Sequence, residues 1–147
     1  MTKAGLRRST SSACALGAAV LGWVGTAPGQ GRAELSGELV CPAAAPGRVV
    51  CSVILRASKQ RLVWADVLVT ATPNFAKPLR ARIGFPQRSE YAEQSVTLPV
   101  PLVAIAEGTG RIAVEGRVVL CAGKGRACSS RRVELTGVVQ VQRKEQP

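Results

Sequence analysis

From about residue 34 onward, apolar and polar residues alternate in short runs that are separated by glycine, proline and serine. A period of two predicts β-strands with one face turned to a core, and no stretch of this region has a helical period. We predict seven strands, over residues 38–41, 49–57, 62–71, 79–85, 95–104, 111–121 and 132–142. Seven short strands in about 110 residues are typical of an immunoglobulin-like antiparallel β-sandwich.

Four of these runs alternate clearly enough to predict which side chains point inward. The predicted inward residues are Val49, Cys51, Val53 and Leu55; Val96, Leu98, Val100 and Leu102; Ile112, Val114, Val118 and Leu120; and Val133, Leu135, Val139 and Val141. In the run 95–104, Pro99 and Pro101 occupy the opposite face. Because proline has no N–H to donate, this run is predicted to be an edge strand.

The middle of the chain gives less regular signals. Residues 62–71 are nearly all apolar, which predicts a central strand covered on both faces, with Trp64 as its core anchor. The prolines of segment 72–78 predict a loop. In the run 79–85, the apolar Leu79, Ala81, Ile83 and Phe85 alternate with arginine, which predicts a half-buried strand.

The first 33 residues are typical of a signal peptide. Lys3, Arg7 and Arg8 provide a basic front, and residues 13–27 form an uncharged, mostly apolar stretch of 15 residues followed by small ones. That stretch is shorter than the roughly 20 residues that a spanning helix needs. We therefore expect export to the periplasm, or alternatively secretion, with no stable membrane anchor after cleavage. The folded domain is predicted to cover residues 34–142, followed by a disordered tail at 143–147.

The chain is basic, with 20 lysines and arginines against 9 acidic residues and a net charge of +11. Removing four basic residues with the leader leaves 16 against 9, a net charge of +7. These cations are expected to solvate the outer faces of strands, although they also favour anionic partners. Nucleic-acid binding is not predicted, because the arginines are spread over several segments and few aromatic side chains accompany them.

Several kinds of chemistry have no signature in this sequence. There is no histidine, so the usual general base, metal ligand and activator of a nucleophile are absent. Asp66 is the single aspartate, and no carboxylate pair can be located. The cysteine spacings do not match a zinc site, and no cofactor is predicted. The sequence therefore carries no hydrolase or metalloenzyme signature, and cysteine redox chemistry remains as the possible enzymatic activity.

Without Cys14, which lies in the leader, the chain keeps four cysteines, and an even number in an exported protein predicts disulfides. Cys41 and Cys51 lie near facing ends of consecutive predicted strands. A bond between them would stabilise that hairpin by roughly 2 to 3 kcal/mol if loop entropy dominates. We interpret this pair as structural.

Cys121 and Cys128 close a short glycine-containing loop between the last two predicted strands. Lys124 and Arg126 lie inside the loop, and cations near a thiolate stabilise it, which favours both attack and departure in thiol exchange. Two hypotheses follow from the residues alone. The pair is either a reactive disulfide or a second structural one, and the latter is ordinary in a small exported sandwich.

Residues 91–135 resemble the end of the N-terminal periplasmic domain of the thiol:disulfide interchange protein DsbD family. The resemblance consists of a tyrosine, a Val-Thr-Leu-Pro-Val strand, a glycine-containing turn, an alternating strand that ends in cysteine, and a second cysteine after a short loop. Here these features are Tyr91, residues 96–100, residues 108–110, residues 112–120, Cys121 and Cys128. Six residues separate the two cysteines where the family commonly has five, and serine and arginine replace the prolines that usually follow the second cysteine.

The resemblance implies an immunoglobulin-like fold and thiol–disulfide exchange through Cys121 and Cys128, one attacking and the other resolving. It implies a separate partner, either a thioredoxin-like protein or a membrane electron donor, because this chain has no Cys-x-x-Cys motif. It also suggests Phe75 as the counterpart of the family's loop that caps the disulfide. The alternative is a non-catalytic structural or binding module, stapled by both disulfides, with its basic face against an envelope component.

Overall fold

Two antiparallel β-sheets face each other in the computed structural model, which describes residues 34–124 and 127–143. The predicted signal peptide lies outside the described residues. The first sheet has the strand order β1 (Leu35–Val40), β2 (Gly47–Ala57), β7 (Ser95–Ala104) and β4 (Ala76–Pro78), and β6 (Glu90–Ala92) also pairs with β7. The second sheet has the order β5 (Arg82–Gly84), β3 (Arg61–Ala71), β8 (Gly108–Ala122) and β9 (Ala127–Val141).

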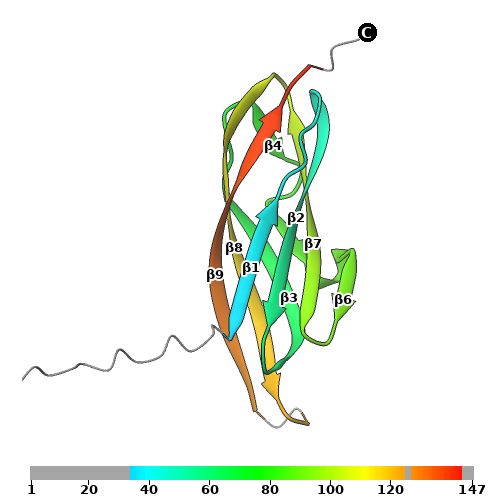
Figure 1. Ribbon diagram of the computed structural model, residues 1–147, viewed down its shortest axis with the longest axis vertical. Coiled ribbons are helices and arrows are strands. Elements are labelled where there is room, and N and C mark those ends of the chain that lie inside the picture. Colours follow the sequence, from blue (N-terminus) through cyan, green and yellow to red (C-terminus); the bar gives the residue numbers. More distant parts are fainter. Residues whose placement is uncertain (1–33, 125–126, 144–147) are drawn as a thin grey trace, which may run out of the picture.

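This strand order is that of an immunoglobulin-like sandwich. Strands β1, β2, β7 and β4 correspond to strands A, B, E and D of that fold, and β3, β8 and β9 correspond to C, F and G. Figure 1 shows the two sheets packed along the length of an elongated molecule. The predicted fold class is confirmed, with nine strands in the described part of the chain rather than seven.

The core between the sheets is built by the alternating strands. The inward residues predicted for β2, β7 and β8 are all buried, as are three of the four predicted for β9, while Val133 is partly buried. Leu39 of β1 also enters this core, where it packs within van der Waals distance of Gly137 of β9. Burial of such aliphatic side chains is the main driving force for pairing the two sheets.

One side of the sandwich is closed by a link between the sheets. Ala44, in the connection that follows β1, donates its N–H to the carbonyl of Gln140 at 3.1 Å and accepts from the N–H of Gln142 at 2.9 Å. Figure 1 shows β1 and β9 side by side at this edge. The connection after β1 therefore pairs with the C-terminal end of the free edge of β9, which would otherwise expose unpaired backbone groups there.

The prediction for Trp64 is wrong. Trp64 is 38% exposed and lies on the outer face of the second sheet, opposite Val119 of β8. A β-bulge between Leu62 and Trp64 inserts one extra residue into β3. Because side chains alternate with a period of two, the bulge moves Trp64 to the face opposite Leu62. β3 is central within its sheet, but its outer face is not covered by a third layer.

The segment between β3 and β7 also differs from its prediction. The expected loop 72–78 contains the short strand β4, which pairs with the end of β7. Of the expected strand 79–85, three residues form β5, and Phe85 begins a 3-10 turn, Phe85–Gln87. Ile83 is buried as predicted, whereas Leu79 is 52% exposed and Ala81 is also exposed. The chain crosses here from one sheet to the other, so that alternation does not continue through the crossing.

Pro99 and Pro101 lie where β7 has an open edge. β2 pairs with β7 along one side, whereas β4 and β6 cover only the two ends of the other side. The carbonyls of Thr97 and Pro101 accept hydrogen bonds from Ser89 and Leu79 on that other side. In an antiparallel strand, every second residue directs its backbone groups to the same side. Pro99 and Pro101 share this side with Thr97, so their ring nitrogens point to the gap between β4 and β6. β7 lies between β2 and β4, so the prediction that the run 95–104 is an edge strand is wrong for the strand as a whole and holds only for the unpaired positions between β4 and β6.

Among the described residues, no helix is long and apolar enough to cross a membrane. Arg143, the last of these residues, forms an ion pair with Glu107 at 3.0 Å.

Candidate functional site

The two disulfides differ in how far they are buried. Cys41 and Cys51 form one of them, and it joins the residue after β1 to the middle of β2. Cys51 is fully buried in the core, and Cys41 is partly buried against it. A thiol in solution has no direct access to Cys51. This environment fits the structural role predicted for the pair.

Cys121 and Cys128 form the second disulfide, across directly opposite positions of β8 and β9. Their Cα atoms are 4.0 Å apart. Cys121 is only 3% exposed, whereas Cys128 is exposed. The disulfide therefore presents one end to solvent and keeps the other end packed against the protein.

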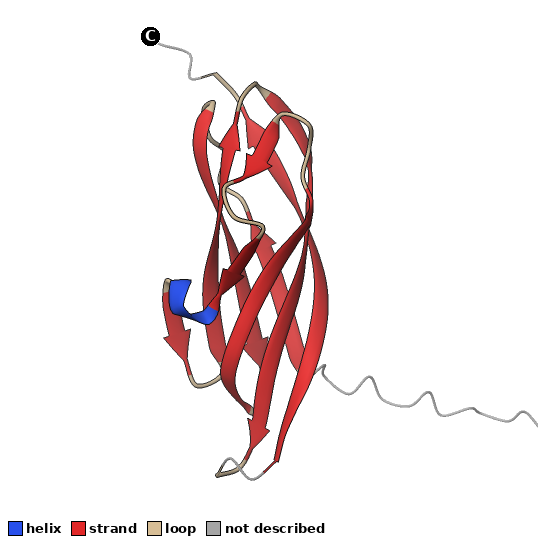
Figure 2. Ribbon diagram, turned by 180° about the vertical axis from the view of Figure 1, so that it is seen from behind, coloured by secondary structure: helices blue, strands red, loops and turns tan. Residues whose placement is uncertain are grey.

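The hairpin that carries this disulfide extends past the rest of the second sheet. β3 pairs with β8 only as far as Arg61 opposite Cys121, so residues beyond Cys121 have no neighbour on that side. Gly123 has φ +54, a left-handed conformation that glycine adopts without strain, and it turns the chain after β8. The tip projects at one end of the molecule, as seen at the bottom of Figure 2.

Not all of the cations expected near the disulfide from the sequence are available there. Lys124 is exposed near the tip, and Arg126 lies outside the described residues. Arg131 and Arg132 are paired with Glu34 at 3.9 Å and Glu115 at 3.7 Å. Sequence reasoning missed Arg61, which opposes Cys121 across the β3–β8 pair.

An aromatic side chain lies on the same face as the disulfide. The register places Trp64, Val119 and Ser130 in one row across the outer face of the second sheet, adjacent to the row of the disulfide. Trp64, Val119 and Ser130 also line a shallow recess of about 180 Å³ together with Arg117, Arg131 and Arg132. The recess therefore adjoins the disulfide on this face.

A buried carboxylate organises the next row of this face. Asp66 is 2% exposed and accepts two hydrogen bonds from Arg117, one of them from Nε at 2.8 Å. Nε of Arg82 lies 3.7 Å from the same carboxylate. The hydrogen bonds and the attraction of the negative charge raise the pKa of Arg117 above its usual value. The guanidinium of Arg117 also lies 5.9 Å from the centre of the Trp64 ring, so this network helps to hold the tryptophan in place.

Phe75 is not near the disulfide. Its ring lies over Gly108 and Gly110 at the beginning of β8, and its carbonyl accepts a hydrogen bond from Ile105 at 2.8 Å. Cys121 is at the other end of the same strand. The suggestion that Phe75 caps the disulfide is therefore wrong.

Tyr91 lies closer to the site than Phe75 does. Its hydroxyl donates a hydrogen bond to the carbonyl of Leu62 at 2.9 Å, one residue along β3 from Arg61. Its ring packs edge-to-face with Phe85 at 5.2 Å, and Arg88 stacks over Phe85. These contacts fix β6 and the 3-10 turn beside the start of β3.

Comparisons with known proteins place few constraints on this chain. No protein-family model matches it, and no curated protein matches its sequence at a significant level. Among solved structures, it is similar to AggA, the major subunit of aggregative adherence fimbriae type I from Escherichia coli. The two share 10% identity with a TM-score of 0.38, over 74% of this chain and 95% of that one. The fold assignment therefore rests on the strand order described above.

Proposed function

We propose that this protein exchanges thiol and disulfide equivalents with a partner protein through Cys121 and Cys128. The observation that carries the proposal is the asymmetry of this disulfide, which has Cys128 exposed near a projecting hairpin tip and Cys121 buried. Exchange requires a sulfur that a partner can reach and a leaving thiolate that the protein retains nearby. Arg61 and Lys124 provide positive charge on that side of the molecule.

The exposures assign the order of the exchange. A partner's thiolate attacks Sγ of Cys128 and forms an intermolecular S–S bond, while the Cys121–Cys128 bond breaks with its electron pair on Cys121. A second partner thiol then attacks the intermolecular bond. The partner leaves as a disulfide, and Cys121 and Cys128 become thiols after taking up two electrons and two protons. The reverse sequence passes those electrons to another protein.

The resemblance to DsbD N-terminal domains supports a particular setting for this chemistry. In that setting a membrane electron donor reduces the pair in the periplasm, and the reduced pair then reduces a thioredoxin-like protein. The immunoglobulin-like sandwich and the location of Cys121 and Cys128 on strands F and G are compatible with this proposal. The leader predicted over residues 1–33 would deliver the protein to that compartment.

A structural role for both disulfides is the second candidate. It is favoured by the burial of Cys121 and by the pairing of β8 with β9, which continues without interruption up to the disulfide. In this case the protein would be a binding module stapled at Cys41–Cys51 and at Cys121–Cys128. The two candidates predict different behaviour of the second disulfide toward thiols.

Measurement of both reduction potentials, together with trapping of mixed disulfides, separates the two candidates. The probe is a thioredoxin-fold protein whose resolving cysteine has been replaced by alanine. For the two single variants, its remaining cysteine carries thionitrobenzoate, which leaves as a thiolate when the free thiol of this chain attacks the probe sulfur. For chains that keep the Cys121–Cys128 disulfide, the probe is used as the free thiol. We expect Cys121→Ser to trap this probe at Cys128, and Cys128→Ser to trap much less of it at the buried Cys121. A Cys41→Ser/Cys51→Ser variant should form the same transient complex as the unmodified protein.

The outcome that contradicts exchange is specific. A Cys121–Cys128 potential below roughly −300 mV is typical of structural disulfides. If that value were found and neither single variant trapped the probe, both pairs would be staples. A higher potential with a mixed disulfide at Cys128 would support exchange.

A further inference from the structure

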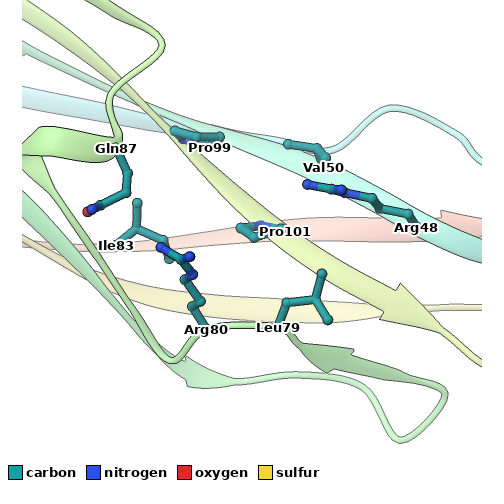
Figure 3. Close-up of a pocket in the computed structure, with 8 residues that line it drawn as sticks. All are labelled: Arg48, Val50, Leu79, Arg80, Ile83, Gln87, Pro99 and Pro101. Carbon is teal, nitrogen blue, oxygen red and sulfur yellow. The ribbon is translucent and has the colours of Figure 1, made fainter.

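A groove on the first sheet has an apolar floor and lies away from the disulfide. It encloses about 320 Å³, near the lower limit for small-molecule pockets. Val50 of β2 and Pro99 and Pro101 of β7 form its floor, and Leu79 and Ile83 from the crossing between the sheets form one wall (Figure 3). Leu79 is 52% exposed and Val50 is 38% exposed. The groove thus leaves large apolar side chains in contact with water.

Positive charge is concentrated at this groove. Arg48 and Arg80 line it. Figure 3 shows the guanidinium of Arg48 turned toward Pro101, and that of Arg80 beside Ile83 on the opposite side of Pro101. Lys77 of β4 lies on the same face, since Arg48 and Lys77 are the two neighbours of Val103 across the sheet. That register separates their backbones by about 10 Å. Within the described part of the chain, none of these three cations has a carboxylate oxygen within 4 Å.

The backbone at this groove does not suit an added β-strand. The outer edge of β7 is open between β4 and β6, but Pro99 and Pro101 stand where N–H donors would be needed. The carbonyl of Pro101 already accepts a hydrogen bond from Leu79, and neither proline has an N–H, so an incoming strand would lack the alternating donors and acceptors that a ladder requires. Recognition at the groove must therefore rely on apolar contact and on charge.

We propose that this groove binds a small amphiphilic anion, one apolar chain or ring that carries a single carboxylate, phosphate or sulfonate group. The apolar part would cover Val50, Leu79 and the prolines, and the acidic group would lie between Arg48 and Arg80. An apolar floor with unpaired guanidinium groups at its rim is complementary to such a molecule in both respects. The groove lies on the first sheet, whereas the Cys121–Cys128 disulfide lies on the second, so this site is independent of the proposed exchange.

Titration with decanoate, below its micelle concentration, tests the proposal on the full oxidised chain. We expect one saturable site by calorimetry, and perturbation of the methyl resonances of Val50, Leu79 and Ile83 by NMR. Arg48→Gln and Arg80→Gln should each weaken binding about three- to tenfold, because each removes a charge-assisted contact. Leu79→Ser should weaken it comparably, and Leu79 is exposed enough for this variant to fold.

The matched controls vary one property at a time. Arg56→Gln removes a cation from the outer face of the same sheet, but Arg56 is paired with Glu38 and lies away from the groove, so decanoate should bind unchanged. Octyl glucoside, a neutral amphiphile, should bind at least about tenfold more weakly than decanoate. Equal affinity for the two probes, or decanoate affinity that is unaffected by both arginine variants, would overturn the proposal.

Two other occupants would also be revealed by these experiments. If phosphatidylglycerol vesicles sediment with the protein while monomeric decanoate does not bind, the groove face is a membrane-binding surface and the proposal is wrong. If an acidic, leucine-containing peptide perturbs the groove methyls and decanoate does not, the occupant is a protein segment and the proposal is equally wrong.

Discussion

At the scale of single residues, Lys124 and Arg61 are the cations that distinguish the surroundings of Cys121 and Cys128. Lys124 lies near the tip of the hairpin, and Arg61 opposes Cys121 on β3. A thiolate leaving from Cys121 would develop its negative charge opposite Arg61 and three residues before Lys124 in the chain. Because nearby positive charge stabilises a thiolate, the rate of disulfide opening should depend on these residues.

Replacing Lys124 by alanine should therefore slow reduction of the Cys121–Cys128 bond by about two- to threefold at low salt. Dithiothreitol is a suitable reductant, and because it attacks as a thiolate, the rate reports the effect of Lys124 on both the attacking and the leaving sulfur. Lys77→Ala, at the far end of the molecule, is the control and should leave the rate unchanged. An identical rate for Lys124→Ala and the unmodified protein would show that this lysine does not assist the leaving thiolate.

Trp64 is the residue whose environment differs most from the one that its apolar neighbours in the sequence predict. It lies on the outer face of β3, beside Arg117, rather than among the core leucines. Trp64→Ser should therefore lower the free energy of unfolding by less than about 1.5 kcal/mol. Leu98→Ala, at a fully buried position of β7, should lower it by about 2 to 5 kcal/mol. Urea unfolding compares the two, and a larger loss for Trp64→Ser would contradict the outward placement.

At the scale of strands, packing of the connection before β4 onto β8 depends on two glycines. A Cβ on Gly110 would lie 2.5 Å from Cβ of Pro73, and one on Gly108 would lie 2.7 Å from the Phe75 ring. We expect Gly110→Ala to displace this connection and to destabilise the protein by about 1 to 3 kcal/mol.

Gly116→Ala in the same strand is the control for the loss of backbone freedom. A Cβ there would approach Val133 at 3.1 Å and Leu55 at 3.3 Å, contacting only the ends of two side chains. Thermal unfolding should rank Gly110→Ala below Gly116→Ala in stability. The reverse order would mean that segment 72–76 moves aside without cost.

The sequence predicts long, alternating strands well and short ones poorly. β2, β7 and β8 each repeat the period of two over at least ten residues, so their inward faces can be derived without a structure. β4, β5 and β6 have three residues each, which is too short for a period to be recognised. Their positions depend on how the chain crosses from one sheet to the other, which is a property of the tertiary structure.

Trp64 and Asp66 show why outer faces are harder to predict than cores. In an almost continuous apolar run, nothing in the sequence marks the bulge that turns Trp64 outward. Asp66 was a signal that could have been used, because an aspartate within such a run requires a partner when buried. The sequence cannot say that Arg117 is that partner, since the register of β3 with β8 depends on the bulge.

The candidate site was predictable in part for a similar reason. Cys121 and Cys128 flank a short loop between two alternating runs, and a hairpin whose turn is centred on that loop brings them opposite each other. Their unequal exposure and the presence of Arg61 depend on where β3 begins. The groove at Arg48 and Arg80 could not be foreseen, because its walls come from β2, β7 and the crossing segment.

At the scale of the whole molecule, the two disulfides should contribute similarly to stability but differ in reactivity. The loops that they close span 10 and 7 residues in sequence. For loops of this size, the chain-entropy model gives each bond about 2.3 to 2.8 kcal/mol. Loop entropy alone therefore does not distinguish a staple from a reactive pair. Access to the sulfur atoms does, since Cys51 is fully buried and Cys128 is exposed.

Brief exposure of the folded protein to dithiothreitol should consequently open Cys121–Cys128 at least about tenfold faster than Cys41–Cys51, whose reduction requires local unfolding of β1 and β2. Alkylation of the released thiols and peptide mass spectrometry identify which bond has opened at each time. In urea that unfolds the chain, accessibility is equal and the two bonds should react at similar rates. If the tenfold difference persisted in urea, it would come from the local sequence around each disulfide, and burial in the folded protein would not explain it.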